Sequence, residues 1–196
     1  MRFPLPLTAK IAAYIIKHKV RRTPKFATVL QLEPLHTCNP SCTGCGRIRE
    51  YSTSIKALLQ LEDCLGAAEE CDAPMISICG GEPLIYPQIE ALVTGLLDQG
   101  RIVYICTNAM FMRRKMRDYL AVLMTQQPAA AEAKLQELVA EELVSAKDAD
   151  EIRKGPKDAT KPVIAPSSWM YWNVHLDGLE RTHDLIVERE GVFVEC

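Results

Sequence analysis

Three closely spaced cysteines are the residues of this chain best suited to do chemistry. Residues 38–45 read CNPSCTGC, so Cys38, Cys42 and Cys45 have the spacing C-x3-C-x2-C. A structural zinc site takes four protein ligands, whereas a cubane iron–sulfur cluster held by three thiolates leaves one iron able to bind a substrate. The spacing therefore favours a [4Fe-4S] cluster in a redox enzyme. The alternative is a zinc site with His36 as the fourth ligand.

A second motif, Gly80-Gly81-Glu82-Pro83, follows a short apolar run. Paired glycines let the backbone approach a ligand where any side chain would clash, and the carboxylate of Glu82 could pair with a cationic ligand group. The alternative is an ordinary turn, because Gly-Gly and Pro are frequent in turns.

The elements that must position these motifs alternate between strands and helices. Apolar runs predict strands, and helical spacing of apolar residues predicts helices. The strands are expected at 28–35, 75–79, 102–106 and 171–176, and the helices at 61–71, 87–99 and 110–124. This alternation indicates an α/β fold with a parallel sheet. Each polar motif follows a strand, at the edge of the sheet where such folds bind ligands.

Two further segments lie outside this pattern. Residues 7–22 predict an amphipathic helix, within an N-terminal segment 1–24, that packs on the domain; the alternative is a basic helix on an anionic membrane surface. Residues 125–168 are too long for a simple connection and predict an insertion. Its part 129–147 has high helix propensity, whereas 154–168 contains three prolines and predicts a loop or a disordered tether.

The composition excludes several classes of protein. An apolar fraction of 48% and a charged fraction of 24% are ordinary for soluble proteins. A net charge of -2 argues against nucleic-acid binding, and no apolar run approaches the roughly 20 residues that span a bilayer. No signal peptide is evident, so we expect a cytoplasmic chain with reduced cysteines.

The motif CNPSCTGC, followed by a strand and GGEP, resembles the radical S-adenosylmethionine (SAM) enzymes. The resemblance implies a partial (βα)6 barrel and a radical SAM core over residues 25–196. It also implies that Cys38, Cys42 and Cys45 hold a [4Fe-4S] cluster, that Gly80, Gly81 and Glu82 contact SAM, and that an external flavodoxin- or ferredoxin-type protein supplies electrons. The residue before the third cysteine is often aromatic in that family, whereas here it is Gly44.

Several segments are similar to one branch of that family, the adenosylhopene transferases of hopanoid biosynthesis. They are LEPLHTCNPSCTGCG, CDAPMISICGGEPL, VYICTNA, WNVHLDG and HDLIVEREGVF. The similarity covers roughly residues 1–120 and 169–193. It implies transfer of the 5′-deoxyadenosyl radical to the alkene of diploptene, which gives adenosylhopane. Because this triterpene substrate is dissolved in the membrane, we expect the chain at the inner membrane surface.

Cys106 ends the third predicted strand and is our candidate catalytic residue. The weak S–H bond of a thiol suits hydrogen-atom donation to a carbon radical, and the resemblance supports this role; the alternative is a small buried apolar residue. Asn108 and Asp177 are the candidate contacts to the adenosyl group, although Asp177 could instead cap a helix near Leu179. Alternation places Asn173, His175 and Asp177 on one strand face.

Four of the six βα units of such a barrel precede Cys196. We therefore expect a C-terminally truncated chain, or half of a split enzyme whose missing C-terminal half is a partner. Two alternative functions remain: a radical SAM enzyme acting on another substrate, and a non-catalytic fragment that binds an iron–sulfur cluster or zinc.

Overall fold

The computed structural model describes residues 4–46 and 53–196. The chain forms two compact units. The first, here called the sheet unit, comprises residues up to Met110 together with Pro166–Cys196, and the second, the helical unit, comprises Phe111–Ala165.

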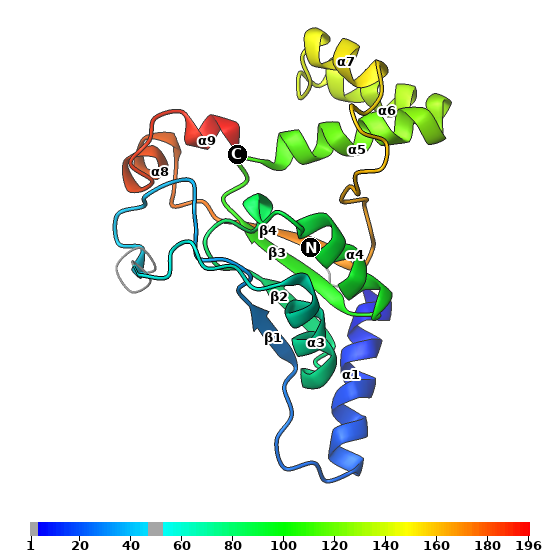
Figure 1. Cartoon of the computed structure of the whole chain (residues 1–196), viewed down its shortest axis with the longest axis vertical. Helices are drawn as coiled ribbons and strands as arrows, with labels where there is room; N and C mark the ends of the chain where they lie inside the picture. Colours follow the sequence, from blue (N-terminus) through cyan, green and yellow to red (C-terminus); the bar gives the residue numbers. More distant parts are fainter. Residues whose placement is uncertain (1–3, 47–52) are drawn as a thin grey trace. The chain divides into compact units, whose positions relative to one another are not determined.

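The sheet unit is built on four parallel strands in the order β1-β2-β3-β4 (Figure 1). The strands are β1 (Val29–Leu32), β2 (Met75–Ile78), β3 (Ile102–Thr107) and β4 (Met170–Val174). The predicted α/β fold with a parallel sheet is therefore confirmed. β1 is shorter than the expected 28–35, and Pro34, which lacks a backbone N–H, lies just beyond its end.

Three helices of this unit lie close to their predicted positions: α1 (Leu5–Val20), α3 (Leu61–Cys71) and α4 (Ile89–Asp98). The unit also contains α8 (Glu180–Ile186), which begins next to Leu179, and two short helices that the sequence did not predict, η1 (Pro83–Ile85) and α9 (Val192–Glu195). The periodicity of α4 explains its packing, because Ile89, Leu92, Val93 and Leu96 are all buried. Asp72 adopts a left-handed conformation with φ 51° where α3 ends.

The two faces of the sheet differ in burial. One face carries Ile76, Ile78, Val103 and Ile105, all 0% exposed, and α3 and α4 lie over the sheet (Figure 1). The opposite face is only partly buried and carries polar and aromatic residues. These are Gln31, Ser77, Tyr104, Cys106, Tyr171 and Asn173. We call this the open face.

The helical unit consists of α5 (Met112–Gln126), α6 (Pro128–Ala140) and α7 (Ala146–Arg153). Its core is formed by Leu120, Leu135, Leu138, Val144, Ala149 and Ile152. The expected insertion 125–168 lies mostly within this unit, but the unit begins earlier, at Phe111, because α5 contributes Leu120 to the shared core. The predicted helix 129–147 ends at Ala140, and Ser145 caps the next helix by accepting from the N–H of Asp148. Residues 154–165 form a loop without helix or strand, as expected for this part of the insertion.

None of the helices described over residues 4–46 and 53–196 has the length and apolar character needed to cross a bilayer.

Candidate metal and cofactor site

The GGEP segment pairs with the chain that leads into the cysteine loop. The N–H of Cys79 donates to the carbonyl of Leu32 (2.9 Å), and the N–H of Glu82 donates to the carbonyl of Thr37 (2.9 Å). These bonds continue the parallel pairing of β1 and β2 past the ends of both strands. A Cβ atom at Gly81 would lie 1.8 Å from the oxygen of Thr37, so this pairing requires glycine.

Glu82 is buried and links two strand ends. It is 1% exposed, and its Oε1 accepts from the Oγ1 of Thr107 (2.7 Å) and the N–H of Leu84 (2.9 Å). Its Oε2 accepts from the N–H of Asn108 (2.9 Å). Burial raises the pKa of Glu82, and the bonds from Asn108, Leu84 and Thr107 partly offset this. Both carboxylate oxygens therefore accept hydrogen bonds from the chain's own residues, so Glu82 positions the neighbouring backbone.

Asn108 joins the end of β3 to the cysteine loop. Its Nδ2 donates to the Oδ1 of Asn39 (2.8 Å) and lies 3.9 Å from the Sγ of Cys38. The Nδ2 of Asn39 in turn donates to the Sδ of Met110 (2.7 Å). The structure thus brings together three segments singled out in the sequence: the cysteine loop, GGEP and Thr107-Asn108. Asn39 was missed, although its place between the first cysteine and Pro40 marks it as a loop residue within reach of the site.

The three cysteines are free thiols on one partly exposed loop. The N–H of Cys45 donates to the carbonyl of Cys42 (3.1 Å), which closes a turn, and Gly44 within it has φ +83°. Thr43 fastens the loop to the α8 region, because its N–H donates to the carbonyl of Ile186 (2.8 Å) and its Oγ1 to Glu188 (2.5 Å). Over the described residues, no three His, Cys, Asp or Glu side chains are close enough to hold a metal ion.

The surroundings of Cys38 and Cys42 raise the pKa values of both thiols. Burial, then the charge of Glu82, raises the pKa of Cys38 to about 12. Burial and the neighbouring Cys45 also raise the pKa of Cys42. In the absence of a metal, these surroundings therefore favour the neutral thiol form of Cys38 and Cys42. Three thiolates are the kind of donor that an iron–sulfur cluster takes, but the sulfur atoms of the described residues are not gathered into a metal-binding group.

His36, the possible fourth zinc ligand, is held next to the loop. Its Nδ1 lies 3.1 Å from the Oγ of Ser54, and the Oγ1 of the adjacent Thr37 donates to the carbonyl of Ile55 (2.6 Å).

Cys106 lies on the open face of the sheet, apart from the cysteine loop. Its Sγ lies 3.4 Å from the Oγ of Ser77 on β2, and it accepts from the Nδ2 of Asn173 on β4 (3.5 Å). Its side chain is partly buried. The thiol is thus held between polar groups of both neighbouring strands. The sequence analysis did not single out Ser77; the feature that could have identified it is its hydroxyl group, the single one within the apolar run MISIC.

Asp177 follows β4 but makes no bond to Asn108 or the cysteines among the described contacts. Its Oδ1 lies 2.8 Å from the Nε2 of His175, whose side chain is 75% exposed. The charge of Asp177 contributes to the raised pKa of Cys42, which places it toward the cysteine loop. The alternative that Asp177 caps α8 is wrong, because Leu179 is the N-cap and no side chain caps it.

His183 and Asp184, for which the sequence suggested no role, organise the end of the sheet unit. The buried Nδ1 of His183 accepts from the N–H of Asp177 (3.1 Å). The carboxylate of Asp184 accepts from the N–H groups of Gly191 (2.6 Å) and Phe193 (2.9 Å) at the start of α9.

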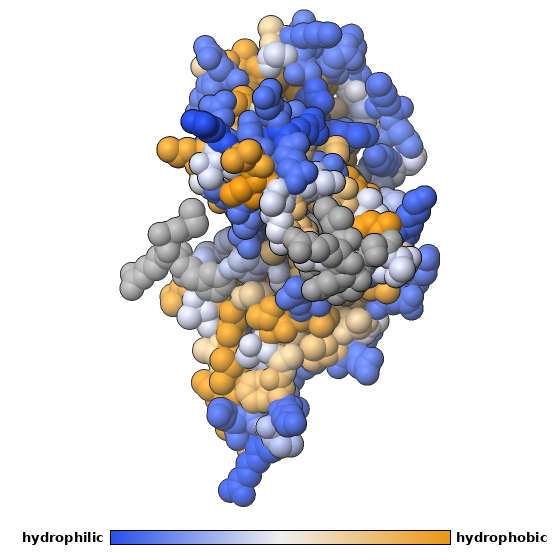
Figure 2. All heavy atoms as spheres, turned by 90° about the vertical axis from the view of Figure 1, so that its left-hand side faces the viewer, coloured by the Kyte–Doolittle hydropathy of each residue, from blue (hydrophilic) through white to orange (hydrophobic). Residues whose placement is uncertain are grey.

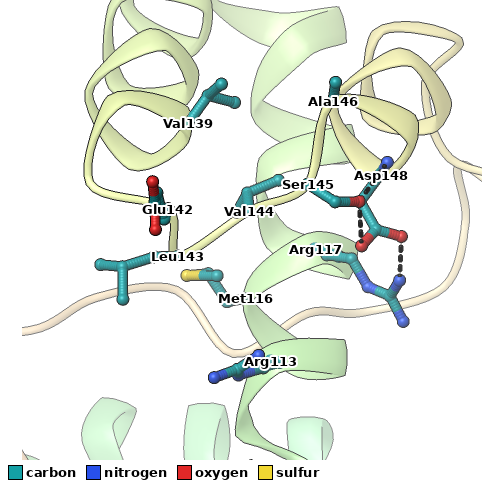
Figure 3. Close-up of a pocket in the computed structure, with 10 residues that line it drawn as sticks. All are labelled: Arg113, Met116, Arg117, Val139, Glu142, Leu143, Val144, Ser145, Ala146 and Asp148. Atoms are coloured by element: carbon teal, nitrogen blue, oxygen red, sulfur yellow. Dashed lines mark hydrogen bonds and ion pairs between the residues drawn. The ribbon is translucent and has the colours of Figure 1, made fainter.

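A pocket of about 450 Å³ lies within the helical unit (Figure 3). Arg117 forms a 2.5 Å ion pair with Asp148 at its edge, and Met116, Val139 and Val144 supply apolar walls. None of the predicted site residues lines this pocket, and we assign it no part in the site.

No protein-family model matches the chain, and comparison with curated proteins gives no match.

Proposed function

We propose that the chain is a radical SAM transferase that adds the 5′-deoxyadenosyl radical to the alkene of diploptene, which gives adenosylhopane. One observation carries the proposal. Asn108 and Glu82 connect the C-x3-C-x2-C loop, the GGEP segment and the end of β3 at one edge of a parallel sheet, where α/β folds place ligands.

In this proposal, the chain's own residues bind and orient the cofactors. Cys38, Cys42 and Cys45 would hold a [4Fe-4S] cluster, which supplies the electron for reductive cleavage of SAM when bound. The backbone at Gly80 and Gly81 would lie at the methionyl end of SAM, and Glu82 would keep that backbone in place. The amide of Asn108 would face the adenosyl group, with Asp177 beyond it.

Cys106 would complete the reaction on the open face. Addition of the adenosyl radical to the alkene leaves a tertiary carbon radical. Transfer of a hydrogen atom from the thiol forms the product C–H bond and leaves a sulfur radical on Cys106. One electron from a flavodoxin- or ferredoxin-type protein and one proton then restore the thiol. The bonds from Ser77 and Asn173 would hold the sulfur in place.

The same proposal also implies a more specific fold and a cellular location for the chain. The strands β1–β4 would be the first four of a partial (βα)6 barrel, with the open face lining its lumen. The chain would work at the cytoplasmic face of the inner membrane, where a dissolved triterpene is accessible.

Anaerobic reconstitution with iron and sulfide, followed by dithionite and SAM with or without diploptene, tests the proposal. Adenosylhopane in the mass spectrum is the expected result. Release of 5′-deoxyadenosine without that product would keep the radical SAM assignment and reject the substrate. Binding of one zinc and no iron would reject the whole proposal.

Substitution of Cys106 separates the cleavage of SAM from the transfer of a hydrogen atom to the product radical. Cys106→Ala should still release 5′-deoxyadenosine, but adenosylhopane should fall at least about tenfold, as for loss of a proton- or hydrogen-transferring group. The control is Cys71→Ser, which changes another partly buried thiol and should keep both yields.

A further inference from the structure

Helix α1 is apolar on two opposite faces. Its inward face includes Leu7, which is 1% exposed, and Tyr14, whose hydroxyl donates to the carbonyl of Ala27 (2.9 Å). His18 on the same face stacks on Phe26 with ring centres 4.6 Å apart. This face accounts for the expected packing of the helix on its own domain.

The outward face of α1 remains exposed although it is also apolar. Leu5 is 80% exposed, Ile16 61% and Val20 77%, and the exposed Ala9 and Ala12 lie between them. Positions 5, 9, 12, 16 and 20 follow one another at helical spacing and therefore form a single stripe along the helix. We call these five residues the outer stripe. Exposed apolar side chains that lie together, rather than singly, are typical of interaction surfaces.

The charged side chains of α1 and of the segment that follows it up to Leu32 are all cationic, and one of them, Lys17, pairs with Asp72 at the end of α3. Of the 23 Lys and Arg residues, seven lie in the first 32 residues, which contain none of the 25 Asp and Glu residues. Lys19, Arg21, Arg22 and Lys25 are exposed where α1 ends. Figure 2 shows hydrophilic atoms at the lower tip of the sheet unit, where the chain leaves α1 in Figure 1.

We propose that the outer stripe lies on an anionic lipid surface. An apolar helix face enters the boundary between headgroups and acyl chains, and nearby cations bind acidic headgroups. A second copy of this chain would fit the outer stripe less well. Its own stripe is accompanied by the same cations, and its first 32 residues contain no carboxylate that could pair with them. The inward face is already packed, so binding needs no folding of the helix. This surface rests on the membrane location proposed above and specifies how the chain would bind there, whereas a test of lipid binding can fail without affecting the proposed adenosyl transfer.

Co-sedimentation of the full chain with lipid vesicles tests the surface. The chain should sediment with vesicles of 70% phosphatidylcholine and 30% phosphatidylglycerol, and only weakly with pure phosphatidylcholine. Ile16→Ser/Val20→Ser should abolish sedimentation with both. Arg21→Gln/Arg22→Gln should weaken binding to the anionic vesicles by about fivefold per cation, which corresponds to about 1 kcal/mol each, and leave binding to neutral vesicles unchanged.

Leu185→Ser is the matched control, since Leu185 is 74% exposed on α8 and should bind as the wild type does. Far-UV circular dichroism checks that each variant is folded. Equal binding to both vesicle types, or sedimentation unaffected by Ile16→Ser/Val20→Ser, would overturn the proposal. It would also be overturned by a lipid-free dimer that Ile16→Ser/Val20→Ser disrupts, because the stripe would then join two copies.

Discussion

At Gly81, the backbone of the GGEP segment passes so close to Thr37 that a Cβ atom would lie 1.8 Å from the carbonyl oxygen and 2.3 Å from the carbonyl carbon. Neither backbone atom can move without breaking the pairing between the two segments. The same pairing leads directly into the cysteine loop. The glycine is therefore needed for the architecture of the site, whether or not a ligand also approaches it.

Gly81→Ala should lower the free energy of unfolding by several kcal/mol, on the order of other large single-residue losses that come from steric overlap. Urea unfolding followed by circular dichroism measures this. Gly66→Ala is the matched control, because a Cβ at Gly66 on α3 meets nothing within 4 Å and alanine should stabilise the helix by about 0.5–1 kcal/mol. Equal effects of the two substitutions would contradict the close approach.

Glu82 makes stability depend on pH in a direction that follows from its burial. Burial raises its pKa above the usual 4.5, so the folded state holds the proton more tightly than the unfolded state does. Its contribution is fully present below pH 4.5 and is lost as the pH rises through the folded pKa. Glu82→Gln removes this titration. The free energy of unfolding of the metal-free wild type, minus that of the variant, should therefore fall as the pH rises above 4.5. A difference that grows with pH would show a lowered pKa instead.

At the scale of the elements, α5 belongs with α6 and α7 rather than with the sheet. Leu120 of α5 shares a core with Leu135, Leu138 and Ile152. Arg117 on α5 also pairs with Asp148 on α7, but both side chains are well exposed, so this pair adds little to stability. The helical unit is therefore stabilised mainly by its own small apolar core.

Leu135→Ala should destabilise the helical unit by about 2–5 kcal/mol, because Leu135 is 0% exposed in its core. Amide hydrogen exchange should show faster exchange across α5, α6 and α7 and unchanged protection in β2 and β3. Leu143→Ala is the control, since Leu143 is 48% exposed and its loss should cost at most about 0.5 kcal/mol. Equal loss of protection in β2 and β3 would show that the units unfold together.

At the scale of the whole molecule, the two units have separate cores and separate optical probes. Both tryptophans, Trp169 and Trp172, lie in the sheet unit, whereas helices of both units contribute to far-UV circular dichroism. Urea unfolding curves from tryptophan fluorescence and from circular dichroism should therefore not coincide. In Leu135→Ala, the fluorescence curve should stay in place while the circular dichroism curve moves to lower urea. Superimposable curves for the wild type would indicate one cooperative unit.

Local patterns in the chain were enough to predict much of the fold. Continuous apolar runs indicated β2 and β3 almost to the residue, and the 3.6-residue period indicated α3 and α4, because strand and helix periodicity depend on neighbours within a few positions. The order of strands and helices also indicated a parallel sheet. That order in turn predicted that the cysteine loop, GGEP and Asn108 would lie at one edge, which the bonds through Asn39 and Glu82 bear out.

What only the tertiary structure decided depends on contacts between distant segments. The helical spacing of α5 is the same whether it packs on a sheet or on α6, so the start of the helical unit at Phe111 was not visible in the sequence. The sequence indicated that the Glu82 carboxylate pairs with a ligand, whereas its burial and its hydrogen bonds from Thr107 and Asn108 make it a link between strand ends. α1 likewise has apolar residues on two opposite faces, and only its packing separates the inner face from the outer stripe. In each case the residues could be identified in the sequence, but the residues that they contact are distant from them in the sequence.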